Sequence, residues 1–229
     1  MSFLRLLLFV CITTPSWAVD KPNILFIAID DQNDWIGYLG GHPLIKTPYI
    51  DALAGRGTAF TNAHCQAPLC NPSRTSLMTG RRPCSTGIYG LAPWFRTVPE
   101  LADIVALPQY FAKHGNYHTA MTGKIYHGSG LPPGDFDVVG PRPGQRLKHD
   151  QRLVKELNGL WDFGPQAYDE GLFQDHLDAT WAIEQMKSKG EKPFFLAIGF
   201  YRPHVPLYSP TRVFKQIPRD EIDLPPVKA

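Results

Sequence analysis

Cys70 stands directly before Asn-Pro-Ser-Arg in the stretch "APLCNPSRTSLMTGRRP". Pro72 suits the first position of a helix and Asn71 suits its N-cap. With Gly80 as a stop signal, the pattern predicts a helix over Pro72–Thr79. Cys70 would then lie at the positive end of a helix dipole, where anions bind and the pKa of a thiol falls. The alternative is an ordinary buried cysteine, because free cysteine is among the most buried residue types.

Two neighbouring acids, Asp30 and Asp31, follow the apolar run "NILFIAID". Such a run is typical of a strand buried on both faces of a mostly parallel sheet. Neighbouring carboxylates repel each other unless a cation or a basic group lies between them. Two hard oxygen donors suit Ca²⁺, with Mg²⁺ as the less favoured choice. The alternative is a turn with solvated acids.

Three further polar residues follow other expected strands. "TGKIYHG" supplies Lys124, a point charge for an anion, and His127, which can exchange a proton near neutral pH. "YRPHVPLYSP" places His204 between two prolines that restrict its loop, so less ordering entropy is lost on binding. Taken alone, Lys124 and His127 are better interpreted as a surface lysine and a chance histidine. A structural role for His204 is as consistent with the sequence as a functional one.

The elements that position these residues alternate between strands and helices. We expect strands at Asn23–Asp30, about Tyr117–Met121 and Pro193–Phe200, with helices in "TPYIDALA", "LPQYFAKHG" and "QDHLDATWAIEQMKSKG". Residues 128–165 resemble a long surface excursion. The pattern predicts an α/β fold with a mostly parallel central sheet flanked by helices. Ligands gather beyond the carboxyl ends of such strands, so the polar residues can meet in one pocket for an oxyanion ester.

Composition and the N-terminal segment limit the class of protein. The chain has 229 residues, 43% of them hydrophobic, and a formal net charge of only +2, which gives no electrostatic footprint for nucleic acid. Residues 1–18 combine a basic start, a short apolar run and small residues before Ala18, which predicts an export signal. An N-terminal membrane anchor is the alternative. We expect an exported protein (periplasmic, extracellular or lysosomal) with no membrane span after cleavage.

Three cysteines follow the predicted signal, an odd number for an oxidising compartment. Cys65 and Cys84 can close a loop around the quoted stretch and leave Cys70 free. A Cys65–Cys70 pair is also possible and would argue against a reactive Cys70.

The quoted segments resemble the sulfatase family, a formylglycine-dependent group within the alkaline-phosphatase-like superfamily. "CNPSRTSLMTGRRP" is similar to its signature, and "KPNILFIAIDD" is similar to its first strand with paired metal-binding aspartates. Two later segments, "TVPELADIVALPQYFAKHGNYHTAMTGKIYHG" and "PFFLAIGFYRPHVPLYSP", resemble the iduronate-2-sulfatase branch in particular. The resemblance covers roughly residues 21–215. It implies that residues 19–229 are the N-terminal part of a sulfatase catalytic domain.

The resemblance also implies a chemistry. A maturation enzyme would read the signature and oxidise Cys70 to formylglycine, whose hydrate attacks the sulfur of a sulfated small molecule or glycan and later expels sulfate. The metal would be Ca²⁺. The implied metal ligands are Asp30, Asp31 and Cys70, and the implied catalytic residues are Cys70, Arg74, Lys124, His127 and His204.

The later metal ligands and the second sulfate-binding lysine of the family have no equivalent in this sequence. We therefore expect a truncated or N-terminal piece that carries about half of the site, with weak or absent activity alone. A phosphoester or phosphonate hydrolase of the same superfamily is one alternative, and a non-catalytic anion-binding remnant is another. A thiol redox role is disfavoured, because there is no Cys-x-x-Cys pair.

Overall fold

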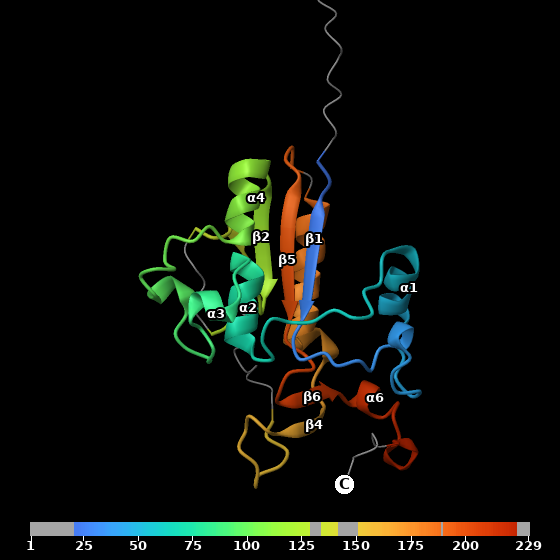
Figure 1. Cartoon of the computed structure of the whole chain (residues 1–229). Helices are drawn as coiled ribbons and strands as arrows, with labels where there is room; N and C mark the ends of the chain where they lie inside the picture. The colour runs from blue at the N-terminus through green and yellow to red at the C-terminus, as the bar shows by residue number, and fades with distance from the viewer. Residues whose placement is uncertain (1–20, 129–133, 142–150, 189, 224–229) are drawn as a thin grey trace, which may run out of the picture.

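The computed structural model describes residues 21–128, 134–141, 151–188 and 190–223. The predicted export signal, residues 1–18, lies outside these ranges. Within them, a four-stranded sheet stands at the centre and its strands end above a smaller two-stranded sheet (Figure 1). Among the described residues, none of the helices combines the length and the apolar character needed to cross a bilayer.

The central sheet has the strand order β1-β5-β2-β3, and every pair in it is parallel. Its strands are β1 (Ile24–Ile29), β5 (Phe194–Phe200), β2 (His118–Gly123) and β3 (Val138–Val139). The first strand of the chain therefore pairs with β5, about 170 residues later in the sequence. This arrangement confirms the predicted α/β fold with a parallel sheet.

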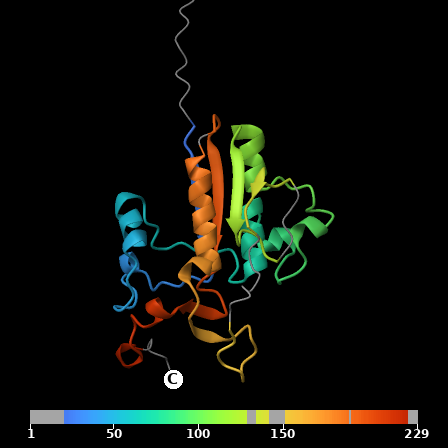
Figure 2. The same cartoon turned by 180° about the vertical axis from the view of Figure 1, so that it is seen from behind.

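Helices cover the two faces of this sheet. Helices α2 (Cys70–Thr79) and α4 (Leu107–Gly115) pack on one face, and α5 (Gln174–Lys187) packs on the other (Figures 1 and 2). Side chains of β5 alternate between these layers: Phe195 joins the aromatic core near α4, while Leu196 joins the core beneath α5. Burial on both faces explains why this strand reads as a continuous apolar run.

The remaining elements are short and surround the sheet. They are α1 (Pro48–Arg56), α3 (Pro83–Thr86), α6 (Thr211–Phe214), and four 3₁₀ turns at Gly37–Leu39, Phe95–Thr97, Glu170–Leu172 and Arg219–Glu221. Helix α1 stands to one side of the sheet, away from α4 (Figure 1).

Strand β1 differs from the expectation of burial on both faces. Leu25 and Ile27 are 43% and 45% exposed, whereas the alternate residues Ile24 and Phe26 pack on the core near α4. The physical reason is position: β1 is one of the two edge strands of the described sheet, and α5 contacts β2 and β5 on that face. Burial along β1 therefore alternates from one residue to the next, and the predicted burial on both faces is wrong for this strand.

Helix α2 begins two residues earlier than predicted. Its first residue is Cys70 and its N-cap is Leu69, so the predicted N-cap, Asn71, lies inside the first turn. The Asn71 side chain instead donates hydrogen bonds to the carbonyl oxygens of Gly90 and Pro93, at 3.0 and 2.9 Å. Tertiary contacts thus use the amide that local capping rules assign to the helix end. The predicted stop is right, since Gly80 closes the helix with a φ of 69°.

The expected surface excursion contains regular structure where it is described. Val138–Val139 forms β3, and β4 (Phe163–Gln166) pairs in parallel with β6 (Leu207–Pro210). Asp162, directly before β4, is buried and accepts hydrogen bonds from the backbone N–H groups of Leu153, Val154 and Phe163. Residues 129–133 and 142–150 of the excursion lie outside the described ranges.

Candidate functional site

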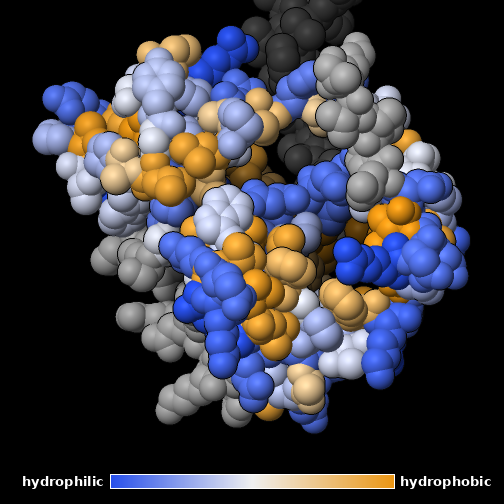
Figure 3. Space-filling view, turned by 90° about the horizontal axis from the view of Figure 1, so that it is seen from below, coloured by the Kyte–Doolittle hydropathy of each residue, from blue (hydrophilic) through white to orange (hydrophobic). Residues whose placement is uncertain are grey.

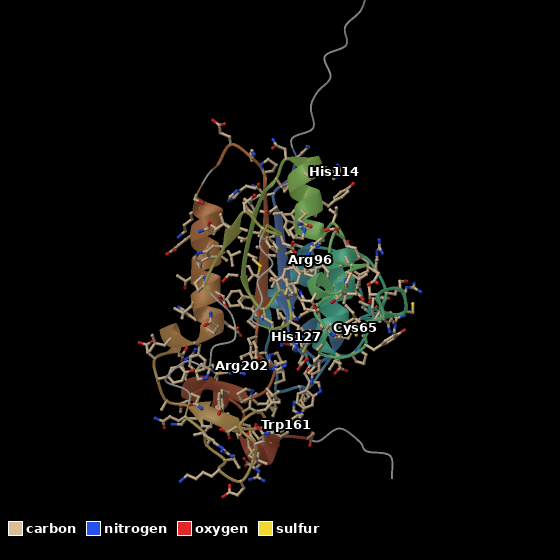
Figure 4. The ribbon with its side chains drawn as sticks, turned by 90° about the vertical axis from the view of Figure 1, so that its left-hand side faces the viewer. Cys65, Arg96, His114, His127, Trp161 and Arg202 are labelled. Carbon is tan, nitrogen blue, oxygen red and sulfur yellow. The ribbon has the colours of Figure 1, made fainter. Side chains whose placement is uncertain are left out.

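The residues singled out from the sequence gather where the strands of the central sheet end. A cavity of about 620 Å³ opens there. It is lined by Asp31, Pro68, Leu69, Cys70, Leu91, Lys124, His127, Gly128, Leu160, Trp161, Tyr201, His204 and Val205. Seen from this end, the surface is hollowed between hydrophilic and apolar groups (Figure 3). His127 and Trp161 lie toward this end of the molecule, and His114 lies at the opposite one (Figure 4).

Asp30 is the buried anion behind the cavity, at only 6% exposure. Its carboxylate accepts a 2.6 Å hydrogen bond from Arg74 and a second one from the ammonium of Lys124. Burial alone would raise the pKa of Asp30, but the hydrogen bonds and charges of Lys124 and Arg74 more than offset this and lower the pKa. The basic groups that the adjacent acids require are therefore supplied by the protein.

Two glycines let the backbone of Lys124 approach the neighbouring strand. Gly123 has a φ of 70°, and a Cβ built on it or on Gly199 would overlap backbone atoms of the other strand. The N–H of Lys124 donates to the carbonyl of Gly199 at 2.6 Å. Arg74 also donates to the carbonyls of Lys124 and Ile125, so helix α2 is tied to the end of β2.

Cys70 occupies the first turn of α2 and faces two basic side chains. Its Sγ lies 3.6 Å from Nζ of Lys124 and 3.8 Å from Nε2 of His204. The positive end of the helix dipole adds to these groups. The two contacts come from the segments that follow β2 and β5, so the thiol lies among basic groups from two other parts of the chain.

The loop after β5 is held by residues that the sequence analysis did not select. Asp175, at the start of α5, accepts hydrogen bonds from the N–H groups of Tyr201 and Arg202 at 2.7 and 2.9 Å. The guanidinium of Arg202 donates to the carbonyl of His204 at 2.7 Å. Tyr201 places its ring 4.8 Å from the Lys124 ammonium. These residues fix the position of His204 from behind.

His127 and Asp31 contribute further polar atoms to the lining of the cavity. Nδ1 of His127 is buried and has no hydrogen-bond partner among the described residues. Burial, followed by the charges of Lys124 and Arg74, lowers the pKa of His127, so its ring is neutral at pH 7. The Asp31 side chain is 56% exposed, and its Oδ2 lies 3.9 Å from Nε2 of His204.

A possible metal-ligand group exists within the described part of the chain. One ligand atom each from Asp30, Cys70 and His204 lies within 4.8 Å of the others. The group shares Asp30 and Cys70 with the ligands predicted from the sequence, and it contains His204 in place of Asp31.

The apolar wall of the cavity was missed because its residues lie in the excursion, where periodicity is weak. Leu160 and Trp161 line the cavity although they are 47% and 61% exposed. Backbone N–H groups of both residues donate to Asn158, at 3.0 and 2.8 Å, so the turn is braced. Two adjacent large apolar residues in a polar loop were the signal that could have found this wall.

Neither suggested disulfide is present. Cys65, Cys70 and Cys84 are all free thiols, and Cys65 and Cys84 are exposed. The two pairings that the sequence left open, Cys65–Cys84 and Cys65–Cys70, are therefore both wrong for this structure. Sγ of Cys70 instead contacts Lys124 and His204.

Comparison with known proteins assigns this chain to a family. The Sulfatase family model matches residues 22–223. A sulfatase of Formosa agariphila is 41% identical over 92% of this chain and 45% of its own length, and the iduronate 2-sulfatase of Mus musculus is 32% identical over 91% and 40%. The crystal structure of a phosphonate monoester hydrolase of Agrobacterium radiobacter shares the fold, with a TM-score of 0.67 at 20% identity over 89% of this chain and 45% of that one. The chain thus spans less than half the length of these proteins. On the family match and the identity to the first relative, it belongs to the sulfatase family.

Proposed function

We propose that this chain carries the nucleophile and the sulfate-binding half of a sulfuric ester hydrolase. The observation that carries the proposal is the position of Cys70: its Sγ lies within 4 Å of Lys124 and His204, at the wall of a cavity, inside the family signature. A singly or doubly charged oxyanion bound there would contact two basic groups and the N-terminus of a helix. These groups stabilise the negative charge that develops during ester cleavage.

The chain's own residues divide the work. Lys124 and His204 bind the sulfate oxygens, and His127, neutral and with a free Nδ1, accepts or donates a proton beside the nucleophile. Arg74 does not line the cavity; it holds Asp30 and the end of β2 in place. It is therefore a positioning residue in this proposal.

Residue 70 acts as nucleophile only after a maturation enzyme has converted it. The aldehyde of formylglycine supplies, when hydrated, an oxygen nucleophile that a thiol does not provide. The first turn of α2 holds this side chain against Lys124 and His204, so the reacting group is oriented before the substrate binds.

The donor set fits Ca²⁺ by its chemistry. Asp30 and Asp31 offer carboxylate oxygens, the ligand type that Ca²⁺ takes, and a formylglycine oxygen at residue 70 would replace a poorly suited thiol. When bound, the ion polarises the ester and stabilises negative charge. Three residues fall short of the six to eight oxygens that Ca²⁺ usually takes, so we expect weak binding by this chain alone.

The substrate in this proposal is a sulfated carbohydrate, and the protein acts after export. The cavity has a charged floor and an apolar wall, which suits a sulfated ring that has one apolar face. The relatives include a protein named iduronate 2-sulfatase, which supports a sulfated sugar rather than a particular one.

The test combines one chemical measurement with one enzymatic measurement on protein isolated from its own host. Peptide mass mapping reports the state of Cys70, and paired sulfate and phosphate esters are then assayed for release of inorganic sulfate and phosphate. We expect formylglycine at residue 70 and release of sulfate in preference to phosphate, with only weak or absent turnover by this chain alone. The Cys70→Ala variant, matched by Cys84→Ala at an exposed thiol, should lose sulfate release while the control keeps it.

Other outcomes separate the alternatives. Faster phosphate than sulfate release would favour a phosphoester or phosphonate hydrolase. An unmodified Cys70 with no ester cleavage would leave a non-catalytic anion-binding protein.

A further inference from the structure

The three possible ligand atoms of the site have a geometry that suits a smaller and softer ion than Ca²⁺. Sγ of Cys70 and Nε2 of His204 are 3.8 Å apart, and Nε2 of His204 is 3.8 Å from Oδ2 of Asp30. Ligands of a tetrahedral zinc ion are separated by about 3.3–3.6 Å, given bonds of about 2.0–2.3 Å. The third pair, Sγ of Cys70 and a carboxylate oxygen of Asp30, lies within 4.8 Å. Shifts of up to about an ångström would therefore close the group around one ion.

The histidine already has the orientation of a metal ligand. Its Nδ1 lies 2.6 Å from the carbonyl oxygen of Val205, to which it donates a hydrogen bond. In the neutral ring this leaves a lone pair on Nε2, and Nε2 faces Cys70 and Asp30. Metal-binding histidines commonly use their other nitrogen in this way, which fixes the tautomer. The carbonyls of His204 and Pro206 accept hydrogen bonds from Arg202, so the loop itself is held.

A cation already lies among these atoms. The ammonium of Lys124 contacts Oδ2 of Asp30 and is 3.6 Å from Sγ of Cys70. The ligand atoms thus converge on a position that favours positive charge. Lys124 also lines the cavity, so its flexible chain has open space in which to move aside. Asp31, with Oδ2 3.9 Å from Nε2 of His204, or a water molecule can complete four ligands.

We propose that the unmodified chain, with Cys70 still a thiol, binds Zn²⁺ through Cys70, His204 and Asp30. On binding, the thiol becomes a thiolate and its proton passes to the solvent, so Zn²⁺ and one thiol give one Zn–S bond and one proton. This site goes beyond the proposed hydrolase because it requires the thiol that formylglycine formation removes. A zinc–thiolate and a formylglycine therefore exclude each other at residue 70, and conversion of this residue changes the preferred metal from Zn²⁺ to Ca²⁺.

The experiment uses the full chain, produced without a maturation enzyme, with the exposed thiols removed by Cys65→Ser and Cys84→Ser. Calorimetric titration with Zn²⁺ measures stoichiometry and affinity, and titration with Co²⁺ gives the near-ultraviolet absorption of a thiolate–cobalt bond. We expect one equivalent of metal. Adding Cys70→Ser should weaken Zn²⁺ binding on the order of a hundredfold and remove the thiolate band, since even residues behind a metal ligand contribute about 10- to 100-fold.

A second measurement keeps the test valid if Cys70→Ser does not fold. Zn²⁺ should slow alkylation of Cys70 by iodoacetamide, and His204→Gln should remove most of that protection, with His64→Gln as the matched exposed control. Unchanged affinity in Cys70→Ser, or equal protection in His204→Gln and the parent, would overturn the zinc site. Neither result bears on sulfate release by the converted protein, so failure of the two proposals is distinguishable.

Discussion

Arg74 connects the buried acid of the site to two elements. It pairs with Asp30 and donates to the carbonyls of Lys124 and Ile125, and its side chain is only 8% exposed. Asp30 carries a negative charge in the folded state because both cations lower its pKa. Removing one cation leaves a buried carboxylate with a single partner and two carbonyls without their donor.

We therefore predict that Arg74→Met lowers the free energy of unfolding by about 3 kcal/mol, the lower end of the cost of breaking a buried ion pair. Urea unfolding followed by circular dichroism measures this value. Arg81→Met is the matched control, because Arg81 is exposed just past the end of the same helix, and it should change stability by less than about 0.5 kcal/mol. Equal effects of the two substitutions would contradict a stabilising role for the Asp30 pair.

At the scale of elements, the β4–β6 sheet supports the wall of the cavity. Asp162 accepts three backbone N–H groups and the hydroxyl of Tyr208 from β6. Burial would raise the pKa of Asp162, but the Tyr208 hydroxyl and the backbone donors lower it to about 2. The hydrogen bonds of Asp162 therefore hold the backbone next to Trp161 in place, although the side chain of Trp161 is exposed.

The depressed pKa of Asp162 predicts a pH dependence of stability. Because the ionised form is favoured by folding, its contribution is fully present above about pH 4 and is lost as the pH falls toward 2. Asp162→Asn removes this dependence and leaves backbone donors unpaired. The gap between wild type and variant in urea midpoint should be largest near pH 6 and shrink as the pH falls from 4 to 2.5. A gap that stays constant over this range would contradict the assignment.

The wall itself predicts how the sulfated ring of the proposed substrate would be held. Trp161→Ala should weaken binding of a sulfated disaccharide about tenfold, since exposed tryptophans that contact ligands commonly contribute at this level, and Trp161→Phe should keep most of the affinity. Binding is measured by calorimetry with Cys70 unmodified, so that the ester is not cleaved. Affinity for inorganic sulfate should not change, and Tyr49→Ala, an aromatic residue that is 90% exposed in α1, is the control. An equal loss of affinity for inorganic sulfate and for the disaccharide would mean that Trp161 supports the sulfate-binding residues rather than the sugar ring.

At the scale of the whole molecule, one face of β1 is apolar and uncovered among the described residues. Leu25, Ile27 and Ile29 are 43%, 45% and 37% exposed in a row along the edge strand. An exposed apolar edge favours pairing with another chain, and a net charge of +2 opposes it only weakly.

We predict that the isolated chain self-associates through this edge. Ile27→Thr should lower the weight-average mass in sedimentation velocity at micromolar concentration. It should lower the free energy of unfolding, measured in urea, by no more than about 1 kcal/mol. Leu77→Thr changes an equally exposed residue, 45%, on α2 and should leave association unchanged. Association that responds equally to both substitutions would place the contact elsewhere.

Much of the fold and of the site could be predicted because the relevant signals are local. The apolar run at 193–200 predicted β5, and glycine stops predicted the end of α2. The positions of Asp30, Lys124 and His204 after strands predicted their convergence, because parallel strands end at one edge. The start of α2 could not be predicted, because Asn71 bonds to Gly90 and Pro93 rather than to its own helix. The prediction that β1 is buried on both faces was wrong for a similar reason, because the position of a strand at the edge depends on the strand order of the whole sheet.

The sequence by itself determined which residue types stand at the strand ends and beside the helix start, since periodicity, proline and glycine act within a few residues. Only the tertiary structure decided that Arg74 and Lys124 share Asp30, that Asp175 and Arg202 hold the His204 loop, and that Trp161 faces the site. These contacts join residues up to 94 positions apart, as in the Lys124–Asp30 pair. Their geometry depends on strand order and packing, which no local pattern specifies.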